Sequence, residues 1–358
     1  QDLQTMYNVA NEIVYGEDEL SHYMESAIKV SGDSPILLDY FLSSAIEVDI
    51  DAVSDGKRVV IGAIMQHIEQ AGIHSGDSAC SLPPYSLPEH IQNEMREIVK
   101  TMAVELKVKG LMNVQLAWQD DKIYVIEVNP RASRTVPFVS KCIGASLAKV
   151  AARCMVDISL EDQAFTKEIT PDFFSVKEAV LPFNKFPGID PILGPEMKST
   201  GEVMGVSQTF AEAYAKAQLA ASNPIPSAGT AFLSVRNPDK SGIVKVASDL
   251  IKAGFDLMAT TGTLKILNEA GYTVQHINKV QEGRPHIVDM IKNDKISLII
   301  NTTEGRQAIA ASATIRSSAE QHDVYYTTTL AGGEAVCMAL KIKDEIKVNK
   351  LQKLHLRG

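Results

Sequence analysis

The hydrophobic pattern of the chain changes at residues 222–229, SNPIPSAG, and this change restricts the fold more than any other feature. Two prolines together with Ser, Asn and Gly cannot continue a helix, so the run predicts a linker at 222–228. With 358 residues the chain is also long for a single hydrophobic core. We therefore expect separate domains on the two sides of this linker.

After the linker, short apolar runs alternate with four or five helical segments. The expected strands are FLSV, FDLMA, VQHIN, SLIINT and VYYTT. Strands that alternate with helices in this way are typical of βαβ units, which build a parallel sheet with helices on both faces. Residues 229–358 are therefore predicted to form a small Rossmann-like α/β domain.

Before the linker, the pattern favours an α+β domain with a mixed or antiparallel sheet. Residues 88–107 carry apolar side chains at three- and four-residue steps, which predicts one amphipathic helix. Two β-like runs joined by Gln119-Asp120-Asp121 predict a hairpin. The full expectation is strands at 36–40, 46–52, 58–65, 113–118 and 123–128, helices at 88–107, 137–156 and 208–221, and irregular structure over the Pro/Gly-rich residues 181–202.

Charge and composition exclude several classes of partner. The formal net charge is -9, so neither nucleic acid nor an anionic membrane surface is expected to be the main partner. Four scattered cysteines without C-x-x-C spacing indicate neither a disulfide framework nor a zinc site. Because no apolar run approaches the ~20 residues of a membrane span and no signal pattern opens the chain, a cytoplasmic protein is expected.

The predicted hairpin carries the sharpest chemical feature. Glu127 and Asn129 point to the same face of their strand, and a three-residue turn centred on Asp120 is expected to place Gln115 opposite Glu127. Oxygen ligands with a single carboxylate suit Mg²⁺ when nucleotide phosphates supply the other ligands. Arg131 and Arg134 follow directly and could neutralise a bound phosphate. On spacing alone, Glu127 could equally be a solvated strand residue and Asn129-Pro130 a turn.

Longer strings around this hairpin resemble a known family. The run VIEVNPRASRTVPFVSK (125–141) is similar, nearly residue for residue, to the large subunit of carbamoyl phosphate synthetase in its C-terminal part. The similarity continues through SGDSAC (75–80), LPFNKFPG (181–188), LGPEMKSTGEVMG (193–205) and EGRPH (282–286). It implies an ATP-grasp domain for the carbamoyl phosphate half at 1–156, its remainder and a hinge at 157–221, the linker at 222–228, and a methylglyoxal-synthase-like allosteric domain at 229–358.

The resemblance also implies an ATP site with two Mg²⁺ or Mn²⁺ ions. Gln115, Glu127 and Asn129 would bind the metal ions, and Arg134 would act with Glu127 and Asn129 in catalysis by stabilising the transferring phosphoryl group. Tyr40 stands where some relatives have histidine. The nucleotide-binding residues implied in this way are Tyr40, Leu42, Glu47, Gly72, Ile73, His74, Ser75, Gln115 and Glu127.

Two effector sites are implied as well. TTGT (260–263) and Asn301-Thr302-Thr303 each follow a predicted strand, where hydroxyls and free N–H groups could hold an anion, although TTGT alone could be a plain helix cap. The resemblance assigns UMP or IMP to Lys240, Thr260, Thr263, Lys279, Asn301 and Thr303. It assigns ornithine to Glu69, Asp77, Glu178, Tyr326 and Thr328, acidic positions that could otherwise be simply solvated.

The implied activity is ATP-dependent phosphorylation of carbamate in a glutamine-hydrolysing enzyme that serves arginine and pyrimidine biosynthesis. The implied partners are a small glutaminase subunit and further copies of the large chain. Residues 1–11 lack the Gly and Arg expected of a phosphate-covering loop, so we expect a fragment that is inactive alone. The alternatives are a non-catalytic effector-binding or oligomerisation module and another ATP-grasp carboxylate ligase.

Overall fold

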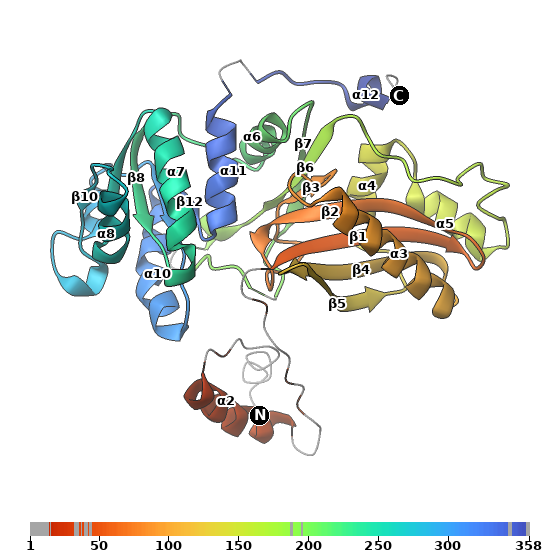
Figure 1. Cartoon of the computed structure of the whole chain (residues 1–358), viewed down its shortest axis with the longest axis horizontal. Coiled ribbons are helices and arrows are strands. Elements are labelled where there is room, and N and C mark those ends of the chain that lie inside the picture. Colours follow the sequence, from red (N-terminus) through yellow and green to blue (C-terminus); the bar gives the residue numbers. More distant parts are fainter. Residues whose placement is uncertain are drawn as a thin grey trace.

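Two separate β-sheets dominate the computed structural model, which describes residues 14, 16–31, 36, 38, 42, 45–186, 189–194, 196–342 and 346–355 (Figure 1). The first sheet has seven antiparallel strands in the order β5-β4-β1-β2-β3-β6-β7. The second has five parallel strands in the order β10-β9-β8-β11-β12. An antiparallel α+β unit followed by a parallel α/β unit is the fold class that the sequence predicts.

The strands of the first sheet lie largely where the hydrophobic pattern puts them. The predicted strands at 46–52, 58–65, 113–118 and 123–128 are present, whereas that at 36–40 lies mostly outside the described residues. The pattern missed the short strand β3 as well as β6 and β7, which flank the irregular Pro/Gly-rich stretch. The strands are β1 (Ile46–Asp55), β2 (Val59–Gln70), β3 (Cys80–Leu82), β4 (Lys109–Gln119), β5 (Lys122–Asn129), β6 (Phe174–Val180) and β7 (Gly201–Ser207).

Alternation along β1 sends apolar and acidic side chains to opposite faces of the first sheet. Val48, Ile50 and Ala52 pack with the apolar side of helix α3 (Glu89–Glu105). Asp49 and Asp51, which alternate with them, are both 1% exposed. The antiparallel sheet therefore buries carboxylates on the face away from α3, and this face carries the candidate site.

The helix predicted at 137–156 is wrong, because two helices occupy this segment. Helix α4 (Val136–Ile143) ends at Gly144, whose φ of 71° is in the left-handed region that favours glycine. Ser146 then caps α5 (Leu147–Met155) by accepting a hydrogen bond from Lys149 N at 3.4 Å. Both helices pack against the face of the first sheet that carries the side chains of Val53 and Met65.

The second sheet confirms the predicted βαβ series. Its strands are β8 (Gly229–Ser234), β9 (Phe255–Ala259), β10 (Gln275–His276), β11 (Leu298–Asn301) and β12 (Tyr325–Thr327). Helices α7 (Lys240–Lys252), α8 (Thr261–Glu269) and α11 (Leu330–Leu340) share a core on one face. Helices α9 (Ile287–Lys292) and α10 (Arg306–Gln321) cover the other.

Several contacts hold the two sheets together. Helix α6 (Phe210–Ala220) follows the first sheet and packs against α11 of the second. Arg316 on α10 forms a bidentate ion pair with Asp190 at 2.7 and 2.6 Å. The C-terminal segment runs back over the first sheet (Figure 1), where His355 on α12 (Leu351–His355) lies with Nε2 2.7 Å from Lys141 O.

Four further elements belong to the described structure. They are helix α2 (Glu17–Ser31) and the 3₁₀ turns η1 (Phe183–Lys185), η2 (Asn237–Asp239) and η3 (Val280–Glu282). Among the described residues, no helix has the length and apolar character needed to cross a membrane.

Candidate active site and effector cavities

The β4–β5 hairpin brings the predicted metal-binding side chains together. Gln115 lies directly opposite Glu127, as expected, and Asn113 lies opposite Asn129. The predicted three-residue turn is wrong, and a turn centred on Asp120 would have set Gln115 opposite Val125 rather than Glu127. Gln119 pairs with Lys122, so the turn consists of Asp120 and Asp121, both with positive φ, as in a type I′ turn. A bulge between the Gln115 and Leu116 pairs then supplies the one-residue shift that aligns Gln115 with Glu127.

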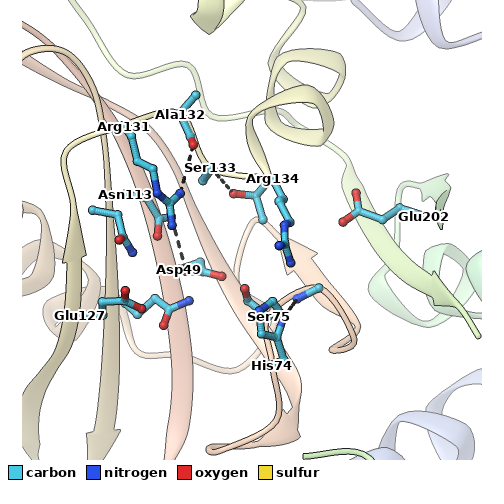
Figure 2. A pocket seen from close by; sticks show the side chains of 14 residues that line it. Asp49, His74, Ser75, Asn113, Glu127, Arg131, Ala132, Ser133, Arg134 and Glu202 are labelled. Carbon is cyan, nitrogen blue, oxygen red and sulfur yellow. Dashed lines mark hydrogen bonds between the residues drawn. The ribbon is translucent and has the colours of Figure 1, made fainter. Parts of the chain in front are cut away.

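These side chains line a cavity of about 460 Å³, here called the first cavity (Figure 2). Arg131 and Arg134 enter it from the loop after β5, and Glu202 faces it from β7. Six predicted residues line it together, namely His74, Ser75, Gln115, Glu127, Asn129 and Arg134. The remaining lining residues are Asp49, Gly76, Asn113, Arg131, Ala132, Ser133, Thr135 and Glu202.

A buried carboxylate beneath the first cavity holds the arginine-bearing loop. Asp51 accepts hydrogen bonds from Ser133 Oγ and Thr135 Oγ1, both at 2.7 Å, and from Asn113 Nδ2 at 3.0 Å. Burial raises the pKa of Asp51 to about 6, although these three donors act in the opposite direction. Asp51 thereby ties strands β1 and β4 to the loop that carries Arg131 and Arg134. Asp51 was not among the predicted site residues, although the alternation of β1 and its pairing with β4 would have pointed to it.

Another buried cluster supports the predicted nucleotide residue Glu47. His67 lies with Nε2 3.0 Å from Asp49 Oδ2 and Nδ1 3.8 Å from Glu47 Oε1. Burial lowers the pKa of His67, but its neighbours Cys80 and Glu47 and the hydrogen bond with Asp49 raise it well above its ordinary value overall. A protonated His67 therefore offsets the buried carboxylates. His67 also escaped the sequence analysis, since a lone histidine in a strand carries no signal.

Four other predicted nucleotide residues, Leu42, Glu47, Gly72 and Ile73, do not line the first cavity. Gly72 N donates to Glu47 Oε2 at 3.3 Å, and Ile73 is buried. Leu42 packs against Ala71 and its neighbours. Tyr40 lies outside the described residues.

The donor set of the first cavity fits a divalent cation bound together with phosphates. Gln115, Glu127 and Asn129 provide amide and carboxylate oxygens on one sheet face, and Asp49 and Asn113 stand next to them. Within the described part of the chain, no three His, Cys, Asp or Glu side chains form a metal site by themselves. A cation here would accordingly need further ligands, which the phosphates of a nucleotide can supply.

The five residues predicted for ornithine line one cavity, here called the second cavity, of about 450 Å³. Glu69, Asp77 and Glu178 come from the first sheet and its loops, whereas Tyr326 and Thr328 come from β12 and the loop after it. Burial raises the pKa of Glu69 to about 7 and that of Glu178 to about 8. Additional lining residues that the sequence did not suggest include Tyr214, Gln218, Glu320 and Tyr325.

The predicted nucleotide-effector residues gather at the carboxyl ends of β8, β9 and β11. Thr260 Oγ1 lies 3.0 Å from Ser234 Oγ, and Thr263 Oγ1 accepts a hydrogen bond from Val235 N at 3.1 Å. Asn301 is buried, and its Nδ2 has no partner among the described residues.

The two predicted lysines differ in their placement. The Lys240 ammonium lies beside Gly262, 3.5 Å from where a β-carbon would stand. Lys279 is exposed at the start of η3, and Thr303 follows β11. Threonine hydroxyls, the unpaired amide nitrogen of Asn301 and the Lys240 ammonium at the carboxyl edge of a parallel sheet are suited to an anionic ligand.

Comparisons with known proteins agree with this architecture. The family described as "Carbamoyl-phosphate synthase L chain, ATP binding domain" matches residues 9–163, and the family described as "MGS-like domain" matches residues 242–328. A solved biotin carboxylase domain of a single-chain bacterial carboxylase aligns with 61% of each chain at 13% identity, but its TM-score is only 0.43.

Curated relatives are much closer in sequence. The carbamoyl phosphate synthase large chain of Pseudomonas syringae pv. tomato is 68% identical over 346 residues, which cover 97% of this chain and 32% of that protein. The large chain of Vibrio cholerae is 59% identical over 348 residues, with the same two shares. The chain thus spans about a third of the length of the relatives it matches. It joins an ATP-binding domain to an MGS-like domain and belongs to the family of carbamoyl phosphate synthase large chains.

Proposed function

We propose that this chain forms the C-terminal part of a carbamoyl phosphate synthase large chain and phosphorylates carbamate with ATP. The observation that carries the proposal is the register of the β4–β5 hairpin. It sets Gln115 against Glu127 and Asn113 against Asn129 under two arginines. Oxygen donors on one side and guanidinium groups on the other suit a metal-bound triphosphate.

Phosphoryl transfer of this kind requires positioning and charge neutralisation and no protein nucleophile. Gln115, Glu127 and Asn129 would hold two Mg²⁺ or Mn²⁺ ions, which when bound supply positive charge against the triphosphate. Arg134 lies across the cavity from the hairpin and would stabilise the phosphoryl group during transfer. Glu47, which lies near His67 and accepts a hydrogen bond from Gly72 N, would face the nucleotide ribose.

The complete reaction would involve more than this chain. Its relatives are about three times longer, so we propose that the 358-residue chain alone does not make carbamoyl phosphate. In the whole enzyme, a small glutaminase subunit would supply ammonia, and copies of the large chain would associate. The product would feed arginine and pyrimidine synthesis.

Two effector classes fit the remaining sites. The second cavity combines three acidic side chains with Tyr326 and Thr328, which suits an amino acid with an ammonium-bearing side chain such as ornithine. The carboxyl edge of the second sheet suits the phosphate of UMP or IMP.

Titration of ADP with Mg²⁺ into the chain tests the proposed nucleotide site. We expect saturable binding that weakens at least about tenfold in Glu127→Gln, because one charge-assisted contact contributes about 1.5–3 kcal/mol. Glu94→Gln is the matched control, since Glu94 is exposed on α3 away from both cavities. Failure of the unaltered chain to bind ADP would refute the proposed site.

A further inference from the structure

The first and second cavities share one wall, and this arrangement carries a functional consequence. His74, Ser75 and Gly76 line the first cavity, whereas Asp77, the next residue, lines the second. Both carboxylate oxygens of Asp77 accept hydrogen bonds at 2.8 Å, from the backbone N–H groups of Lys198 and Ser199. Residues 74–77 are here called the shared wall. Their first three members line the first cavity, and the carboxylate of Asp77, which lines the second cavity, holds the segment in place.

Strand β6 also lies between the two cavities. Lys177 and Glu178 are neighbours on this strand, so their side chains point to opposite faces. Glu178 lines the second cavity. The Lys177 side chain is fully buried, and its Nζ donates a hydrogen bond to Ser75 O at 2.9 Å and lies 3.7 Å from Glu202 Oε1. Both Ser75 and Glu202 line the first cavity.

Acidic side chains at both cavities balance the positive charge of Lys177. Burial lowers the pKa of Lys177, but Cys80 and the carboxylates of Glu202, Glu178 and Glu69 raise it overall. Two of these carboxylates, Glu178 and Glu69, line the second cavity. A buried ammonium depends on its few anionic neighbours, so any change in their charge alters how strongly it is held toward the shared wall.

We propose that Lys177 is a positioning residue that couples the two cavities, transmitting the charge state of Glu69 and Glu178 to the Ser75 carbonyl and Glu202. A cationic ligand in the second cavity would neutralise Glu69 and Glu178. The ammonium of Lys177 would then be attracted less to that side and would interact more strongly with Ser75 O and Glu202. This coupling rests on the proposed nucleotide site in the first cavity.

A double-mutant cycle on ADP affinity in the presence of Mg²⁺ tests the coupling without any second ligand. The four chains are the unaltered protein, Glu178→Gln, Lys177→Met and the double variant. The titrations are made at about pH 9, where Glu178, with a pKa of about 8, is ionised. Removing the Glu178 charge then mimics its neutralisation, so we expect Glu178→Gln to tighten ADP binding at least about fivefold when Lys177 is present. In the Lys177→Met background, we expect Glu178→Gln to change the affinity less than about twofold. Glu334→Gln is the control, because Glu334 lies on α11 and pairs with Lys245.

An equal effect of Glu178→Gln in both backgrounds would overturn the coupling while leaving the nucleotide site intact. Absence of ADP binding by the unaltered chain would instead refute the nucleotide site and, with it, the coupling. If Lys177→Met does not fold, amide hydrogen exchange in Glu178→Gln alone provides the test. We expect the exchange rates of residues 74–77 to change at least about fivefold. Rates identical to those of the unaltered chain would overturn the proposal.

Discussion

Gln115 on β4 lies directly opposite Glu127 on β5, although the turn between the strands holds two residues. A two-residue turn without a bulge would pair Gln115 with Ile126, whose side chain points to the other face. The bulge in β5 restores the alignment. The composition of the candidate site therefore depends on one irregularity that lies well away from the turn.

The close packing of β7 against α6 leads to a prediction about folding. A β-carbon at Gly205 would lie 2.0 Å from Ala213 O and 2.5 Å from Ala217 N, both backbone atoms of α6. Gly205→Ala should therefore lower the free energy of unfolding by ~3 kcal/mol, as overpacking does. Urea denaturation measures this, with Gly201→Ala on the same strand as control, since its β-carbon would meet Val180 at an ordinary 3.9 Å. Equal stability of the two variants would contradict the packing.

The ion pair between the sheets gives a second prediction. Asp190→Asn leaves the guanidinium of Arg316, which is 2% exposed, without its counter-charge. We expect a loss of ~3 kcal/mol in the free energy of unfolding, as for other broken buried pairs. Glu161→Gln breaks the exposed pair with Arg58 and should cost less than ~1 kcal/mol. Urea denaturation measures both losses. Similar losses in the two variants would contradict the prediction that the Asp190–Arg316 pair stabilises the fold more than the exposed Arg58–Glu161 pair does.

The second cavity should make stability depend on pH. Burial raises the pKa of Glu69 to about 7 and of Glu178 to about 8 from an ordinary 4.5, so the folded chain keeps protons that the unfolded chain releases. Their contribution to stability is complete below pH 4.5 and is lost as the pH rises through about 7 and 8. Each group should contribute a slope of up to about 1.4 kcal/mol per pH unit.

Urea denaturation between about pH 5 and 9 measures this slope. Glu178→Gln should flatten it, because the amide of the variant does not titrate. An unchanged slope in Glu178→Gln would contradict the assignment of the pH dependence to this cavity.

The carboxyl edge of the second sheet yields a prediction about UMP. Lys240 begins α7 beside Gly262, so Lys240→Met should weaken UMP binding about tenfold, as expected for loss of one charge-assisted contact. Lys252→Met changes the last residue of the same helix and should leave the affinity unchanged. Calorimetric titration compares the two variants. Equal affinities would place the UMP site elsewhere.

Much of the fold follows from hydrophobic period alone. β1 alternates clearly, β2 begins as a continuous apolar run, and the second sheet shows the strand–helix rhythm of βαβ units. The break at Gly144 was missed because apolar spacing continues across it. Strands β6 and β7 were missed because they border the Pro/Gly-rich stretch, and pairing with β3 and with each other defines them.

The candidate site was predictable only where its residues are close in the sequence. Gln115, Glu127 and Asn129 share one hairpin, and alternation of faces puts Glu127 and Asn129 on the same side. The bulge that aligns Gln115 with them left no signal in the sequence. Glu69, Glu178 and Tyr326 come from distant segments, and only the resemblance to the carbamoyl phosphate synthetase family joined them. His67 and Lys177 remained unnoticed, since burial by tertiary packing gives them their importance and leaves no local pattern.

Binding of Mn²⁺ tests the central claim most directly. Electron paramagnetic resonance counts the ions that the chain binds in the presence of a non-hydrolysable ATP analogue. We expect two ions for each unaltered chain, few without the nucleotide, and a clear loss in Glu127→Ala, with Glu94→Ala as control. Retention of both ions by Glu127→Ala would contradict a metal–nucleotide site on the β4–β5 hairpin.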